Sequence, residues 1–288
     1  MKRWIIGAAL ALLSLSTWAL QPYVAGDKVN AADLKSAMAA VEQKLNAEGF
    51  TVVGRHTPKG ILAYGVVVVT EPGLTDALKQ LGGTAVIGIP IRVGVKADGA
   101  VSYLNLEYWG RGYIRKDYGK IETASKAAAA KLEKALGAGK PFGGDLKPEE
   151  LPTYHYMFGM ERFDDKSMLR QYGSFDEALA KVRENLAKGP RNSAKIYELV
   201  YLDRKLAIFG VAHNDPEKGE AWWVNKIGAD HIAALPWELF IVDGKVYALH
   251  GHFRTALAWP SLGMGQFMTI SKHPDYVLEL MEDLAGAQ

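Results

Sequence analysis

The feature that most constrains the fold is a pattern that occurs twice in the chain at one spacing. Tyr64-Gly65-Val66 recurs as Phe209-Gly210-Val211, and the turn dipeptide Asp98-Gly99 recurs as Asp243-Gly244, each 145 residues later. The same offset relates apolar positions after the turns: Val101 and Val246, Leu104 and Leu249, Tyr108 and Phe253. A constant offset across such different features predicts two tandem copies of one folding unit.

Each copy begins with the pattern of an amphipathic helix. Two sets of apolar residues have spacings of four, three and four, which place each set on one helical face: Leu34, Met38, Val41 and Leu45, then Phe175, Leu179, Val182 and Leu186. Asp33 and Ser174 stand at matching N-cap positions, and Gly49 and Gly189 follow the helices. We therefore expect a helix near the start of each unit.

Three segments of each copy have the alternation and composition of β-strands. They cover 61–70, 91–96 and 101–108 in the first copy, and 206–212, 237–242 and 246–253 in the second. An Asp-Gly pair separates the last two segments of each set, which predicts a hairpin, and closing helices are expected over 123–136 and 274–284. The predicted fold class is α+β, with two tandem repeats at 30–137 and 173–288, each an antiparallel-rich sheet backed by helices.

Residues 138–172 connect the two repeats. Their Gly/Pro-rich start leads into the aromatic run Tyr154-His155-Tyr156-Met157-Phe158. A free tether would be polar throughout, so we expect this connector to pack on one or both repeats. It also carries the carboxylate pairs Glu149-Glu150 and Asp164-Asp165. Adjacency in sequence does not make side chains converge as an acid/base pair, and we expect both pairs to be solvated.

The first 19 residues have the pattern of a secretory signal peptide. Lys2 and Arg3 give a positive start, an apolar run extends from Trp4 to Leu15, and Thr17-Trp18-Ala19 forms a small-x-small cleavage pattern. The apolar run is shorter than the about 20 residues of a membrane span. We expect a periplasmic or secreted mature chain with no stable membrane insertion after cleavage; the alternative is an N-terminal segment retained as an anchor.

Charge and composition exclude several classes of function. Loss of Lys2 and Arg3 from 34 basic residues leaves 32, which equals the 32 acidic residues. A neutral chain lacks the basic surface that nucleic acid requires, so we expect a small molecule or a protein as partner and no nucleic acid. The chain has no Cys, which excludes disulfides, thiolate chemistry and haem attachment through Cys-x-x-Cys-His. With 49% hydrophobic residues, we expect two separate cores.

The segments around the two predicted hairpins resemble the domain-of-unknown-function 302 family. The first repeat carries the resemblance in Ile89-Pro90-Ile91-Arg92-Val93-Gly94-Val95, Asp98-Gly99-Ala100-Val101 and Glu107-Tyr108-Trp109. The second carries it in Leu235-Pro236-Trp237-Glu238-Leu239-Phe240-Ile241 and Asp243-Gly244-Lys245-Val246. For most of 33–137 and 173–286 the resemblance implies a small α+β domain with a sheet backed by helices. Family members often have Asn-Pro where this chain has Val66-Val67 and Val211-Ala212, so no functional residue is transferred.

The best candidate site is His250-Gly251-His252-Phe253-Arg254. On a strand, His250, His252 and Arg254 would point to one face. They could bind an anionic or polar small ligand there, or the histidines could hold a metal ion together with His213 or His231. A solvated or hydrogen-bonded sheet face is the structural alternative. The first repeat has Asn105, Glu107 and Trp109 at the matching positions, so this site would belong to the second repeat alone.

Two further patterns concern contacts with a ligand or a partner. Arg111 lies in Trp109-Gly110-Arg111-Gly112-Tyr113, which we expect to be a glycine-rich turn that could close over a ligand. The Trp222-Trp223 pair is expected on a strand, where the two rings point to opposite faces, so that one of them, with Trp259, could contact a partner. Four methionines are expected in the core: Met157, Met160, Met264 and Met268.

The sequence supports no reaction class, since Gly-x-Ser-x-Gly is absent and no other catalytic set is recognisable. We expect an exported, noncatalytic binding or interaction protein that uses the sheet face around His250. The alternative is a metal- or cofactor-dependent protein, with an enzyme as one case, that uses the same histidines; the sequence identifies no particular cofactor. A third hypothesis is a structural subunit that packs on its partner through tryptophans.

Overall fold

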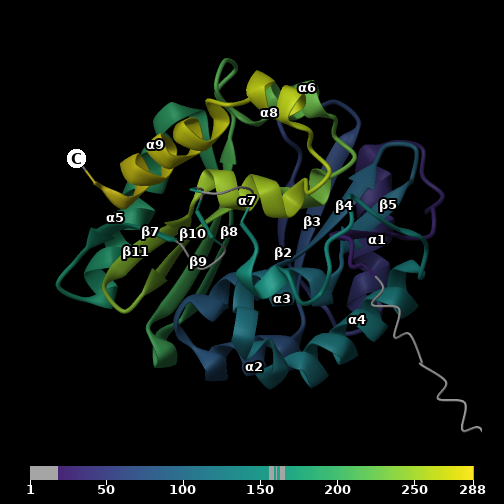
Figure 1. Cartoon of the computed structure of the whole chain (residues 1–288), viewed down its shortest axis with the longest axis horizontal. Helices are drawn as coiled ribbons and strands as arrows, with labels where there is room; N and C mark the ends of the chain where they lie inside the picture. Colours follow the sequence, from purple (N-terminus) through teal and green to yellow (C-terminus); the bar gives the residue numbers. More distant parts are fainter. Residues whose placement is uncertain (1–18, 156–158, 160, 163–165, 288) are drawn as a thin grey trace, which may run out of the picture.

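The computed structural model describes residues 19–155, 159, 161–162 and 166–287. The fold is α+β, with two antiparallel sheets that are backed by helices. Figure 1 shows the two sheets side by side, with α5 and α9 on the outer side of the second sheet and α1 and α4 beside the first. The predicted signal peptide lies outside the described residues, except for Ala19.

The first sheet has six strands in the order β2-β3-β4-β5-β1-β6. Their bounds are β1 Tyr23–Ala25, β2 Thr51–His56, β3 Tyr64–Thr70, β4 Ile91–Lys96, β5 Val101–Leu104 and β6 Pro141–Phe142. Helix α1 (Leu34–Ala47) covers the outer face and packs on α4 (Glu122–Leu136). The inner face carries Arg92 and Gly94, which contact residues of the second half.

The second sheet has five strands in the order β7-β11-β10-β9-β8. Their bounds are β7 Lys166–Gln171, β8 Ser193–Tyr201, β9 Leu206–His213, β10 Trp237–Val242 and β11 Lys245–Leu249. Helix α5 (Phe175–Lys188) and helix α9 (His273–Ala285) pack on each other and on this sheet. Helices α1 and α5 are the two helices that the apolar spacing predicted. The side chains of Asp33 and Ser174 cap them, as expected, by accepting hydrogen bonds from the backbone N–H groups of Ser36 and Glu177.

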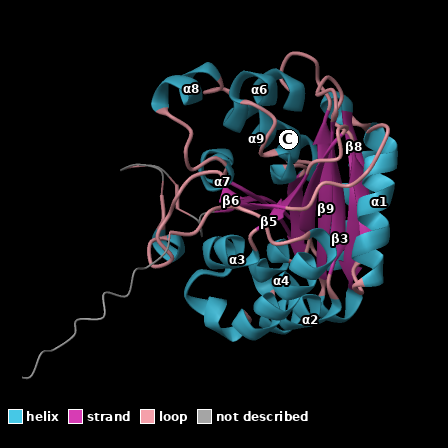
Figure 2. Ribbon diagram, turned by 90° about the vertical axis from the view of Figure 1, so that its right-hand side faces the viewer, coloured by secondary structure: helices cyan, strands magenta, loops and turns pink. Residues whose placement is uncertain are grey.

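The remaining helices fill the ends of the sheets. The α-helices among them are α2 Pro72–Leu81, α3 Leu106–Ile114, α6 Glu220–Ile227, α7 Gly251–Ala258 and α8 Met264–Thr269. The short 3-10 helices of the described residues are η1 Gly83–Gly88, η2 Arg115–Lys120, η3 Leu151–Thr153, η4 Pro190–Asn192, η5 Leu202–Arg204 and η6 Ile232–Ala234. Figure 2 shows α2, α3 and α4 at one end of the strands and α6 and α8 at the opposite end. In the described part of the chain, none of the helices combines the length and the apolarity that crossing a bilayer requires.

The predicted strands over 101–108 and 246–253 are too long, because a helix begins within each of these segments although apolar residues continue to alternate there. Strands β5 and β11 end at Leu104 and Leu249, and the next residues, Asn105 and His250, are the N-caps of α3 and α7. The segments predicted as strands over 105–108 and 250–253 are therefore caps and first helical turns. Arg111 lies within α3, not in a glycine-rich turn. Asparagine caps α3 by accepting from two backbone amides.

The tryptophans and methionines also differ from expectation. Trp222 and Trp223 lie on helix α6, not on a strand, and successive helical positions are about 100° apart. Met264 and Met268 lie on α8 with exposed fractions of 45% and 61%, so they are surface residues. Met157 and Met160 lie outside the described residues. A short helix with few neighbours cannot bury a full apolar face.

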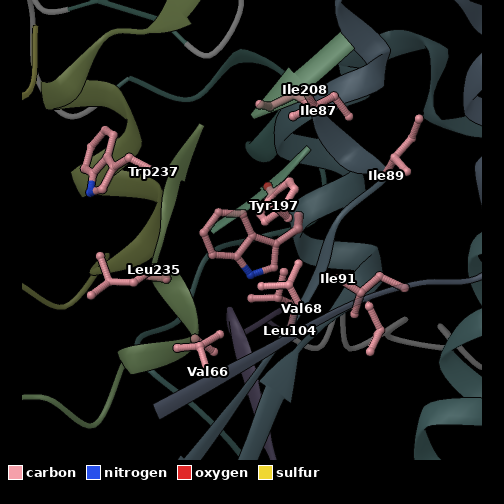
Figure 3. Close-up of a cluster of buried hydrophobic side chains, with 14 of the residues drawn as sticks. Val66, Val68, Ile87, Ile89, Ile91, Leu104, Tyr197, Ile208, Leu235 and Trp237 are labelled. Carbon is pink, nitrogen blue, oxygen red and sulfur yellow. The ribbon is translucent and has the colours of Figure 1, made fainter. Parts of the chain in front are cut away.

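The connector packs on both halves. Its β6 pairs with β1, and its β7 adds an edge strand to the second sheet by pairing with β11. Leu151 is fully buried. The buried apolar residues of both halves form one connected core, in contrast to the two cores that we expected. Figure 3 shows part of this core, in which Val68 and Leu104 of the first half lie with Tyr197 and Trp237 of the second.

Candidate functional site

Two of the predicted site residues meet a carboxylate from the connector. His250 Nδ1 is 3.8 Å from Glu161 Oε1, and His252 Nδ1 is 3.6 Å from Glu161 Oε2. The three side chains are each about one-third exposed, with fractions of 31%, 30% and 32%. Ser167 of β7 lies 3.4 Å from His250 Nε2. We call Glu161, His250 and His252 the carboxylate–histidine cluster.

Helix geometry separates the third predicted residue from this cluster. Arg254 lies one turn after His250 on α7, and only 1% of its surface is exposed. Its Nη2 donates to the Ala234 carbonyl at 2.6 Å and lies 3.6 Å from Glu238 Oε2. The accessible cluster therefore lacks the Arg254 cation that the sequence predicted there, and it contains the Glu161 carboxylate, which the sequence did not predict. Its electrostatics favour a cation or a hydrogen-bond donor over an anion.

The other predicted histidines lie elsewhere. His213 ends β9 with 4% of its surface exposed, and His231 stacks on Trp259 and lies 2.9 Å from the Ala258 carbonyl. Within the described residues, no group of three or more His, Asp or Glu side chains is arranged to hold a metal ion. Arg111 pairs with Glu107 at 2.7 Å, one helical turn earlier.

A buried ionic cluster lies between the two sheets, and the sequence reasoning missed it. Arg92 of β4 donates its Nη1 to Glu238 of β10, and its Nε donates to the Ala233 carbonyl at 2.9 Å. Arg254 approaches the other oxygen of Glu238. The side chains of all three are at most 1% exposed. Burial by itself lowers the pKa of Arg92, but the charge of Glu238 together with the Tyr113 and Tyr197 hydroxyls outweighs this effect, so the pKa is raised.

Aromatic rings surround the buried ionic cluster of Arg92, Glu238 and Arg254. The Trp109 ring centroid lies 5.2 Å from the Arg92 guanidinium and 5.0 Å from that of Arg254. Such cation–π contacts offset part of the desolvation of the two cations. The Tyr197 hydroxyl is buried, and among the described residues it has no hydrogen-bond partner. Burial raises its pKa, so the phenol stays neutral between the charged groups.

A second buried polar group lies where β2 of the first sheet meets α6. His56 of β2 and Glu220 of α6 approach to 2.7 Å with 2% of each side chain exposed. The His213 backbone N–H donates to the other Glu220 oxygen at 3.4 Å. His273 is fully buried and stacks on Trp223 with ring centroids 4.0 Å apart. The structure therefore buries two histidines that no sequence motif indicated, His56 and His273.

These buried histidines predict that stability falls in mild acid. Burial lowers the pKa of His273 well below its usual value, aided by the charges of His213, His252 and Arg254, and burial also lowers the pKa of His213 and His231. The unfolded chain takes up protons below about pH 6.5 and the native chain does not. The free energy of unfolding should therefore be level above this pH and fall below it, by up to about 1.4 kcal/mol per pH unit for each such histidine.

Urea denaturation between pH 5 and pH 8 measures this dependence. A His273→Phe variant keeps an aromatic ring against Trp223 and removes one titrating group, so its stability should fall less steeply between pH 6.5 and pH 5. Parallel pH profiles for the two proteins would rule out His273 as a source of the acid sensitivity.

The sequence did contain a signal for Arg92 and Glu238, but hydrophobic periodicity does not detect it. Arg92 is the second residue of β4, in which the only other charged residue is Lys96 at the end, and Glu238 is the second residue of β10, which is otherwise apolar. A lone charge in such a strand needs a buried partner, and both charges occur at the same place in the two predicted hairpins. The sequence does not indicate that Arg92 pairs with Glu238, because the two residues lie 146 positions apart.

Glu149 and Glu150 of the connector play no part in these clusters. Glu149 and Glu150 are exposed, and Glu150 pairs with Lys147 at 3.2 Å. Asp164 and Asp165 lie outside the described residues. Comparison of the whole chain with protein-family models, with curated proteins and with solved structures found no match.

Proposed function

We propose that the chain is an exported, noncatalytic binding protein whose ligand contacts the carboxylate–histidine cluster. One observation carries this proposal. Glu161 Oε2 is buried, and among the described residues it receives no hydrogen bond, although two partly exposed imidazoles flank its carboxylate. A buried acceptor without a donor costs about 1–3 kcal/mol, and a bound cation or N–H donor would remove that cost.

The ligand class follows from the charges of the cluster. Glu161 brings a carboxylate to the cluster, and its negative charge disfavours the anionic ligand that the sequence suggested. Imidazole nitrogens also accept hydrogen bonds from ammonium groups. We therefore propose a small ligand with a primary ammonium or similar donor group, and we propose a periplasmic or secreted location from the N-terminal signal pattern. The resemblance of each half to the domain-of-unknown-function 302 family is part of the same proposal.

The experiment uses protein without an affinity tag, prepared from the periplasmic fraction of a Gram-negative host. Its mass should match a chain that begins at Leu20, the residue after the predicted cleavage pattern. Side-chain ¹⁵N spectra of the histidines are then recorded with methylammonium and, separately, with Zn²⁺. Shifts of His250 and His252 with methylammonium support the proposed ligand class, and no response to it contradicts that class.

A paired variant tests the residues. Replacing His250 and His252 together by alanine should weaken binding of the responding probe at least about tenfold, which corresponds to about 1.4 kcal/mol. Replacing Asn105 and Glu107 by alanine, at the matching places in the first half, is the control and should leave binding unchanged. A stoichiometric metal in the purified protein that both histidines are needed to retain would instead favour the metal-dependent alternative.

A further inference from the structure

We infer that the two halves of this chain are copies of one unit that associate through a two-fold interface, as a dimer contained within a single polypeptide. The element order supports this inference first. In each half, a strand precedes a helix, two strands, a helix with a 3-10 segment, a hairpin and two or more helices. The strand orders correspond as well, since β2-β3-β4-β5-β1 matches β8-β9-β10-β11-β7.

A bulge in each sheet fixes the alignment of the two halves. The β2–β3 register shifts between Val52 and Gly54, and the β8–β9 register shifts between Lys195 and Tyr197. Each shift leaves one bulged residue on the first strand of its pair. Aligning these bulges makes Gly54 the counterpart of Tyr197.

The pairing across the strands then extends the alignment. Gly54, Val68 and Arg92 face one another across β2, β3 and β4. Tyr197, Gly210 and Glu238 do so across β8, β9 and β10. Arg92 and Glu238 are therefore counterparts, and so are Val68 and Gly210. The sequence offset of 145 does not relate β3 to β9, because it would make Gly65 the counterpart of Gly210. Gly65 faces Met38 of α1 on the outer side of its sheet, whereas Gly210 faces the Tyr197 ring on the inner side.

Counterparts contact each other at three places. A Cβ on Gly54 would lie 3.1 Å from Tyr197 Cβ, and Arg92 donates to Glu238. The third pair follows from the helix caps, since Trp109 and Arg254 each lie four residues after an N-cap, and they form a cation–π contact. In a two-fold dimer only residues close to the axis meet their own counterparts. We take these three pairs to mark where the inferred two-fold axis passes between the halves.

The two 3-10 helices η1 and η6 also pack reciprocally, each on the sheet of the other half. The 3-10 helix η1, which leads into β4, packs on β9 and β10 of the second sheet. Its counterpart η6, which leads into β10, packs on β3 and β4 of the first sheet. Each half therefore covers part of the inner face of the other, as in an isologous interface. This exchange explains why the buried residues form one core.

The charges show how the halves have diverged. Two identical copies would place Arg opposite Arg, or Glu opposite Glu, at a position without solvent, and buried like charges strongly destabilise an interface. Arg92 opposite Glu238 removes this conflict only for a pair of unlike halves. An ion pair away from the interface is also reversed, since Glu42–Arg55 and Arg183–Glu198 join the opening helix to the first strand of the bulged pair at 2.6 Å in each half.

Cutting the chain between the halves tests the inference. A protease recognition sequence is inserted between Gly159 and Met160 of the full mature chain, and the folded protein is cleaved. The two fragments should co-elute as one folded species, and their melting temperature should rise with protein concentration because unfolding now releases two chains. Fragments that separate at micromolar concentration and each remain folded would overturn the inference, as would a melting temperature independent of concentration.

Charge exchange at the axis gives the sharper test. In the cleaved protein, Glu238→Arg alone and Arg92→Glu alone should each weaken fragment association at least about 100-fold, since each opposes like charges. The double variant keeps the net charge of the buried ionic cluster and should recover at least about tenfold of that loss. Additive losses in the double variant would overturn the two-fold relation.

A matched control exchanges a charge pair that lies within one half. Glu42→Arg combined with Arg55→Glu copies the arrangement that Arg183 and Glu198 already have in the second half. This variant should leave fragment association unchanged within about twofold, because exposed ion pairs contribute little. An equal loss from this exchange would show that association does not depend on the axis residues.

Discussion

Replacing Glu238 by leucine is expected to lower the free energy of unfolding by about 3–5 kcal/mol. The substitution leaves two guanidinium groups, Arg92 and Arg254, in a site where neither side chain is more than 1% exposed. Transfer of an unpaired charge out of water is the dominant cost. Urea denaturation of the mature chain, followed by tryptophan fluorescence, measures the loss.

Two further variants separate the charge effect from lost packing. Arg92→Met should cost less than Glu238→Leu, because Glu238 keeps Arg254 at 3.6 Å. Combining the two substitutions should restore part of the stability that Glu238→Leu alone removes, because one buried cation remains instead of two. Losses that simply add, or a double variant less stable than Glu238→Leu, would contradict this account of the cluster.

Trp223→Ala is expected to lower the free energy of unfolding by about 3–5 kcal/mol. The Trp223 ring is 1% exposed and packs between Trp259, at a centroid distance of 5.0 Å, and His273 at 4.0 Å. Alanine leaves a cavity that this aromatic layer cannot close, since it is built from rings on three separate elements. Thermal and urea denaturation both report the loss.

The neighbouring residue is the control for this prediction. Trp222 is half-buried, with its ring edge-on to Tyr276 and Lys226 over its face at 3.8 Å. Trp222→Ala should therefore cost about 1 kcal/mol or less. Similar losses for both substitutions would contradict the helical placement of the pair. Of the three tryptophans proposed to contact a partner, only Trp222 is accessible enough to do so.

Local periodicity predicted the parts of this fold that depend on one element at a time. The opening helices at Leu34 and Phe175 were predicted because a four-three-four spacing and an N-cap are properties of a single helix. The ends of β5 and β11 were not, since alternating apolar residues continue into α3 and α7. Trp222 and Trp223 were wrongly predicted to lie on a strand, because two adjacent aromatic residues show no hydrophobic period that distinguishes a strand from a helix.

The candidate site divides in the same way. The sequence indicated that His250 and His252 belong together, and they do share Glu161. It could not indicate Glu161, whose approach depends on how the connector returns to the second sheet. It also placed Arg254 with the histidines, whereas helix α7 turns that side chain into the buried ionic cluster.

By itself, the amino-acid sequence determined the α+β class, the helix that opens each half and the hairpin turns, because these follow from periods and turn residues within short segments. Only the tertiary structure decided which charges meet and that the halves share one core. Arg92 and Glu238 are paired by the packing of one sheet on the other, and a contact between residues 146 positions apart leaves no period in the chain.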